Sequence, residues 1–187
     1  MPTPSRSQQS ILIDSVFHKR EQYIVEAFCE RLEQLERRQQ LAHVSGIRDE
    51  AFLDRLLGLG ITAESLAALG LVPLVCVAWA DGEVAARERE RIVALAQAAG
   101  IEPQNGRYPL LEHLLKRRPA PEMVAAWQDY IKQLREMMSA EDLETLRLEI
   151  LNRAGEVARA SGGLLGFGDR VSPAEQAVLA QLEQAFG

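Results

Sequence analysis

Aromatic residues are scarce in this 187-residue chain, since Phe, Trp and Tyr together make up 5% of it. Hydrophobic residues nevertheless account for 47%, so a core must be built mainly from aliphatic side chains. A basic excess is also lacking, because 21 Lys and Arg residues face 27 Asp and Glu residues, for a formal charge of −6. Proteins that bind nucleic acid usually present a basic face that displaces counterions from the phosphates. The composition therefore argues against nucleic-acid binding and predicts a folded, mildly acidic protein.

Long apolar runs are missing as well. The longest, residues 71–80, is interrupted by Pro73 and is shorter than the roughly 18 residues that a membrane-spanning helix needs. The first ten residues contain no apolar segment of the kind found in secretory signals. We therefore expect a cytoplasmic protein without a transmembrane segment, and peripheral association with a membrane stays open as an alternative.

Signatures of common catalytic sites are absent too. The sequence contains no HExxH zinc motif, no GxxxxGK[ST] phosphate loop and no GxGxxG after a strand. Its two cysteines, Cys29 and Cys76, lie on apolar helical faces without CxxC spacing, which predicts buried reduced thiols rather than a disulfide or a metal site. Trp79 and Trp127 are expected to fill the aliphatic core.

Nearly every periodic segment that is present has the spacing of a helix, which predicts an all-α fold, a compact irregular multi-helix bundle. Residues 8–40 predict one long amphipathic helix. Arg31 interrupts any continuous heptad, so we expect this helix to pack back on the bundle, and a homodimer through it is the alternative. The predicted organisation is an N-terminal helix over residues 1–45, appended to or packed on a helical domain over residues 46–187.

Within that domain, turn and capping residues divide the chain into shorter helices. Pro73 favours a buried helix over a strand for residues 71–80, because proline suits the first turn of a helix. Thr62, Ser139 and Ser172 are predicted to cap helix starts. The other helices are expected over residues 49–57, 62–69, 85–99, 108–117, 122–138, 139–160 and 172–186.

Two turns share one degenerate plan, in which an apolar helix is followed by a polar turn, a valine and, four residues later, a glutamate. Val84 and Glu88 form the first instance, and Val171 and Glu175 form the second, after a glycine-rich excursion over residues 163–168. The first turn also matches the second half of an EF-hand loop, but Val77 and Trp79 occupy loop positions 1 and 3, so an ordinary calcium loop cannot form. The two turns indicate a pair of related helix-turn-helix units.

The acidic residues at these turns have two readings. The simpler one is that they cap helix N-termini, where a carboxylate accepts free backbone N–H groups. The sharper one is that the turns lie side by side and bind a divalent cation, Mg²⁺ or Ca²⁺, through oxygen ligands and waters. The candidate ligands are Asp81, Glu83, Glu88, Asp169 and Glu175.

At these residues the sequence resembles the TerB-like tellurite-resistance family. The resemblance is carried by residues 71–101, LVPLVCVAWADGEVAARERERIVALAQAAGI, and residues 157–182, VARASGGLLGFGDRVSPAEQAVLAQL, and extends over roughly residues 58–187. It implies a helical domain of two pseudo-repeated units with neighbouring acidic turns, proposed as a metal-binding surface, in bacterial stress-response systems without established enzymatic chemistry. Asp81 and Glu88 match the first motif, whereas Ser161 stands where the second motif usually has Asp.

The expected function is therefore a non-catalytic stress-response module that binds a protein partner and a divalent cation at its acidic turns. A metal-dependent hydrolase that uses the same carboxylates is the first alternative. Against it stands the lack of a nearby histidine or lysine that could serve as acid or base. A metal-free helical adaptor is the second alternative.

Overall fold

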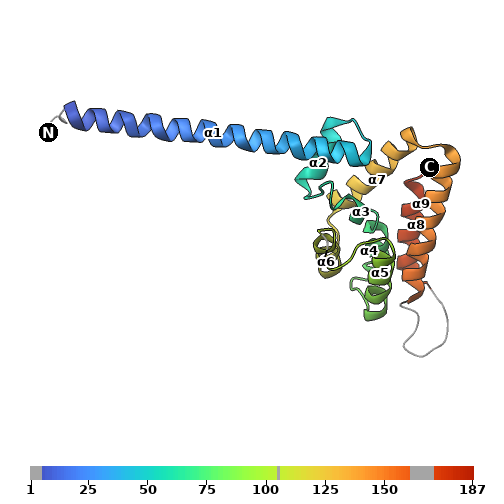
Figure 1. Ribbon diagram of the computed structural model, residues 1–187. Coiled ribbons are helices and arrows are strands. Elements are labelled where there is room, and N and C mark those ends of the chain that lie inside the picture. The colour runs from blue at the N-terminus through green and yellow to red at the C-terminus, as the bar shows by residue number, and fades with distance from the viewer. Residues whose placement is uncertain (1–5, 105, 161–170) are drawn as a thin grey trace.

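The protein is described by a computed structural model that covers the backbone of residues 6–104, 106–160 and 171–187, and the side chains of these ranges from residue 23 onward. Within these ranges the chain is helical and contains no strand, which confirms the predicted all-α fold (Figure 1). The helices are α1 (Arg6–Ser45), α2 (Glu50–Gly58), α3 (Leu66–Leu69), α4 (Val72–Ala78), α5 (Ala86–Ala98), α6 (Tyr108–Lys116), α7 (Pro121–Met137), α8 (Ala140–Ala160) and α9 (Pro173–Gln184).

Helix α4 lies at the centre of the bundle. It packs against α5, α6, α7, α8 and α9, and all of its residues except Cys76 are buried. Pro73 lies in its first turn, where a missing N–H costs no intrahelical bond. The Val-rich run is therefore the buried helix that the sequence predicted, because an all-apolar surface needs neighbours on every side.

Helix α1 behaves differently, since most of it extends away from the bundle as a single rod (Figure 1). Residues 23–34 are exposed, and from residue 23 onward the first fully buried side chain is that of Leu41. Among the described residues, only the C-terminal end of α1 packs on the rest of the protein, chiefly on the nine-residue helix α2, which is too short to cover more. The expectation that α1 packs back on the bundle is therefore wrong for residues 23–34, and the appended alternative describes them.

Most predicted helix ends lie within a few residues of the observed ones. Asp49 caps α2, because its Oδ1 accepts a hydrogen bond from the Phe52 N–H at 3.1 Å. The prediction that Thr62 caps the next helix is wrong: α3 begins at Leu66, and the Thr62 N–H instead donates to the Ser65 hydroxyl at 2.9 Å. The polar turn before α3 is therefore closed by Ser65.

The core is aliphatic around one buried indole. Trp127 is 1% exposed and meets the ring of Phe186 edge to face, with ring centroids 6.1 Å apart. Trp79 is half-buried, and its Nε1–H donates to the Leu114 carbonyl at 3.0 Å. The core prediction is thus confirmed for Trp127 and only partly for Trp79.

The two cysteines are free, as predicted, but only one is shielded from solvent. Burial raises the pKa of the half-buried Cys76 thiol to about 11, so it stays protonated at neutral pH. Cys29 is exposed, which contradicts its predicted burial, because it lies on the projecting part of α1. Among the described residues, no helix is long and apolar enough to span a membrane.

Candidate functional site

The first acidic turn connects α4 to α5. Gly82 adopts a φ of +105°, a conformation that suits glycine, and Val84 is half-buried against the core. The Ala85 N–H then donates to Glu88 Oε2 at 2.8 Å. Ala85 has no side-chain acceptor to offer in return, so α5 begins with half of a capping box.

The second acidic turn ends at the start of α9, where the capping box is complete. The Glu175 N–H donates to the Ser172 hydroxyl at 3.2 Å, and the Ser172 N–H donates to Glu175 Oε2 at 2.5 Å. Val171 is half-buried against the core, as Val84 is in the first turn. The valine-to-glutamate spacing thus produces the same local structure twice, and the predicted capping role is confirmed for both glutamates.

The two helix starts meet inside the bundle. Helix α4 packs on both α5 and α9, and α8 contacts the same two helices. Glu88 is 2% exposed and Glu175 is 4% exposed, although both are ionisable residues that rarely become this buried. Their side chains are close enough to form a hydrogen bond with each other. We refer to Glu88 and Glu175 as the buried carboxyl pair.

The pair changes the acidity of Glu88. Burial, which disfavours the charged form, is the main reason that the pKa of Glu88 rises to about 7. The hydrogen bond from the Ala85 N–H stabilises the carboxylate and opposes this rise. The negative charges of Asp81 and Glu175 and the hydrogen bond with Glu175 raise the pKa further. A hydrogen bond between two carboxyl groups requires that they share a proton.

The other predicted ligands differ in how closely they approach the buried carboxyl pair. Asp81 is exposed but close enough for its charge to act on Glu88. Glu83 is exposed, and its backbone N–H lies 3.5 Å from Asp81 Oδ1, while its carboxylate is not among the groups that act on Glu88. Asp169 and the glycine-rich excursion lie outside the described residues. In the described ranges, no group of three His, Cys, Asp or Glu side chains is arranged to hold a metal ion.

The sequence pattern did not reveal that one acid of the α5 charge run is buried. Residues 87–91 alternate in charge, a pattern typical of a solvated helix face, and Arg87, Arg89 and Glu90 are exposed. Arg89 also bonds the Leu115 carbonyl at 3.1 Å, at the C-terminal end of α6, where free carbonyls favour a cation. The signal that separated Glu88 from its neighbours was its distance of four residues from Val84.

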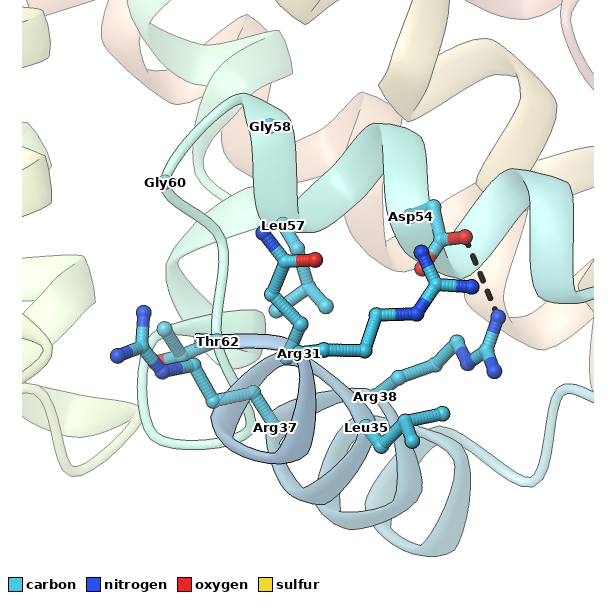
Figure 2. A pocket seen from close by; sticks show the side chains of 10 residues that line it. Arg31, Leu35, Arg37, Arg38, Asp54, Leu57, Gly58, Gly60 and Thr62 are labelled. Carbon is cyan, nitrogen blue, oxygen red and sulfur yellow. Dashed lines mark hydrogen bonds and ion pairs between the residues drawn. The ribbon is translucent and has the colours of Figure 1, made fainter. Parts of the chain in front are cut away.

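A hollow of about 510 Å³ lies at the base of the α1 rod, where no sequence pattern predicted a cavity (Figure 2). Arg38 bridges two residues of α2, with its Nη1 at 3.1 Å from Glu50 Oε2 and 3.2 Å from Asp54 Oδ2. Figure 2 shows Arg31 extending toward Asp54 as well. The two ion pairs of Arg38 join the base of α1 to α2, across 12 and 16 residues of sequence.

No family model, no curated protein and no solved structure matches this chain.

Proposed function

We propose that this protein is a non-catalytic, TerB-like module of a bacterial stress response that binds one divalent cation at the buried carboxyl pair and a protein partner elsewhere. The observation that carries the cation proposal is the burial of Glu88 and Glu175 in mutual contact at two equivalent helix starts. Two ionised carboxylates in such a position repel each other, and their burial leaves that repulsion poorly screened. A cation between them would remove that repulsion.

The buried carboxyl pair offers only two carboxylates, which favours Mg²⁺ over an ion such as Ca²⁺ that needs more ligands from the protein. Mg²⁺ is often held by one or two carboxylates and keeps several of its waters, whereas Ca²⁺ takes six to eight oxygen ligands. Each glutamate has one oxygen engaged by a backbone N–H, which leaves its second oxygen as the ligand. The exposed Asp81 carboxylate would act through the outer waters, because its charge already reaches Glu88.

Thermal unfolding tests the cation site. At pH 8, where Glu88 is ionised, we expect Mg²⁺, Ca²⁺ or Mn²⁺ to raise the melting temperature in a saturable way compared with EDTA. Glu88→Gln and Glu175→Gln should each abolish this rise. Glu90→Gln is the matched control, because Glu90 is an exposed glutamate two residues further along α5.

The same experiment separates the metal-free adaptor from the proposal. The proposal fails if none of the three cations changes the melting temperature of either the unmodified chain or the Glu88→Gln variant. The buried carboxyl pair is then a structural contact in which the two glutamates share a proton. That reading has its own support, since both glutamates already cap helices. A rise that survives in both glutamine variants would place a cation elsewhere on the protein and would also overturn the proposal.

The stress-response part of the proposal is tested in cells. Deleting the gene from its host should increase sensitivity to tellurite, and the unmodified gene should restore tolerance. The Glu88→Gln, Glu175→Gln double variant should fail to restore it at equal protein abundance. Unchanged tellurite tolerance in the deletion strain would argue against this assignment and would leave the cation site to be judged by the unfolding experiment.

A further inference from the structure

The exposed part of α1 carries an apolar face that no part of the described chain covers. Ile24 is 56% exposed, Phe28 is 63% exposed and Leu32 is 44% exposed. Further along α1, Arg38, Ala42 and Ser45 lie on the side that packs against the bundle, at helical spacing from these residues. Because single helices gain most of their stability from packing, a rod with an uncovered apolar face favours a partner.

Five apolar residues of α1 recur at a spacing of eleven positions. Residues 13, 24 and 35 are Ile, Ile and Leu, and residues 17 and 28 are both Phe. Eleven residues in three turns correspond to about 3.67 residues per turn, close to the 3.6 of a straight helix. The apolar stripe, defined here as positions 13, 17, 24, 28 and 35, therefore runs nearly straight along the rod, even though Arg31 breaks a heptad pattern.

The central part of this stripe is also symmetric along the chain. Positions 13 and 28 lie at equal distances from the midpoint between residues 20 and 21, and so do positions 17 and 24. When two copies of such a helix run in opposite directions around that midpoint, each of these layers brings together a position occupied by Ile and a position occupied by Phe. At the centre, Arg20 of each copy is opposite Glu21 of the other.

The charge distribution selects the antiparallel orientation. Residues 6–20 contain Arg6, Lys19 and Arg20 against one acid, Asp14. Residues 21–36 contain five glutamates against a single Arg31. Antiparallel pairing places the basic half of one helix beside the acidic half of the other, whereas parallel pairing places five glutamates beside five glutamates.

We propose that α1 pairs with α1 of a second copy of this chain as an antiparallel two-helix rod centred between Arg20 and Glu21, with one helical bundle at each end. In this register, positions 6–10 of the second copy lie beside positions 31–35. Arg31 and Leu35 of the first copy line the hollow at the base of its rod (Figure 2). The hollow therefore offers space for the N-terminal end of the second helix next to the first copy's bundle. Such a dimer is isologous and closed, which limits assembly to two chains.

The molar mass of the full chain in solution tests the pairing. Light scattering after size exclusion should give about 42 kDa, twice the 20.8 kDa of one chain. Phe28→Glu and, independently, Ile24→Glu should lower the mass to that of one chain without changing the melting temperature of the bundle. Leu148→Glu is the control, because Leu148 is a 47% exposed leucine on α8, and it should leave the dimer intact. A monomeric unmodified chain, or a dimer that survives both α1 variants, overturns the proposal.

Disulfide trapping tests the direction of the helices. In a Cys29→Ser background, Ser10→Cys together with Arg31→Cys should form covalent dimers under mild oxidation, because positions 10 and 31 are opposite in the antiparallel register. Ser10→Cys alone should not, because the two copies of position 10 are then 21 residues apart along the rod, about 30 Å. Efficient trapping by Ser10→Cys alone would show a parallel pair and overturn the proposed arrangement.

Discussion

Helices α5 and α9 begin in nearly the same way and differ in one oxygen atom. Ala85 and Ser172, which precede them, have φ and ψ of −64° and 153° and of −67° and 159°. Each then receives a backbone hydrogen bond from the residue four positions later, and a glutamate caps each from the third helical position. Only Ser172 returns a side-chain hydrogen bond. The backbone at these turns therefore does not need the serine hydroxyl, and the start of α5 depends on Glu88 alone.

The largest effect should come from removing the glutamates one at a time. Glu88→Ala should lower the free energy of unfolding by about 2 kcal/mol, because it removes the only side-chain cap of α5 and leaves space at a buried position. Glu175→Ala should cost roughly half as much, because the Ser172 hydroxyl still accepts from the backbone N–H at position 175. Urea unfolding at pH 6 measures both, with Glu90→Ala as the exposed control. Equal losses at the two positions would contradict the asymmetry.

A smaller effect should appear in the pH dependence of stability. The pKa of Glu88 is about 7 in the folded protein against an ordinary 4.5, so the folded state holds a proton that the unfolded state has released between these values. The contribution is fully present below pH 4.5 and is lost as the pH rises through 7. Between pH 5.5 and 7.5 we expect the free energy of unfolding to fall by on the order of 1–2 kcal/mol.

Glu88→Gln provides the matched variant for this measurement. Its amide oxygen can still accept from the Ala85 N–H, its amide hydrogens can donate to Glu175, and it does not titrate. Urea unfolding at several pH values should therefore show a flatter profile for Glu88→Gln than for the unmodified chain. A slope of the same size in both proteins would assign the pH dependence to other groups.

Much of the bundle could be predicted from spacing and capping residues. The all-α class, the buried helix around Pro73 and the start of α9 at Ser172 and Pro173 depend on local chemistry that the sequence carries. That Glu88 and Glu175 lie close together could be suggested only by the repeated spacing of a valine and a glutamate in the two turns. Their contact depends on how α4 and α8 bring α5 and α9 together.

Burial was harder to predict than helix position. Cys29 and Cys76 both lie on apolar helical faces, but only Cys76 belongs to a helix that has neighbours on all sides. Glu88 belongs to a run of alternating charges on α5, yet its side chain is buried, unlike those of its neighbours in the run. A one-dimensional pattern gives the faces of a helix, whereas the neighbour that covers each face is decided by long-range packing.

A smaller effect again should follow from exchanging the residues before the two helices. Ala85→Ser should stabilise the protein by about 0.5–1 kcal/mol, because the backbone already has the geometry in which Ser172 caps α9. Ser172→Ala should destabilise it by about the same amount, which makes each variant the control for the other. The difference is measured by urea unfolding at pH 6. If Ala85→Ser does not increase the free energy of unfolding, the Glu88 backbone N–H is not placed to donate to a hydroxyl at position 85, and the two helix starts differ at that point.

The smallest effect should come from Asp81, which belongs to the first turn and acts on Glu88 through its charge. Asp81→Asn should lower the pKa of Glu88 by a few tenths of a pH unit, because Asp81 is exposed and its charge is screened by water and salt. Glu83→Gln removes another exposed charge, which does not act on Glu88, so it should leave that pKa unchanged. NMR titration of the Glu88 carboxyl carbon at low salt measures both, and the Asp81 effect should shrink in 1 M salt. If Glu83→Gln shifts the titration as much as Asp81→Asn does, the field at the first turn is diffuse, and Asp81 has no special relation to the buried carboxyl pair.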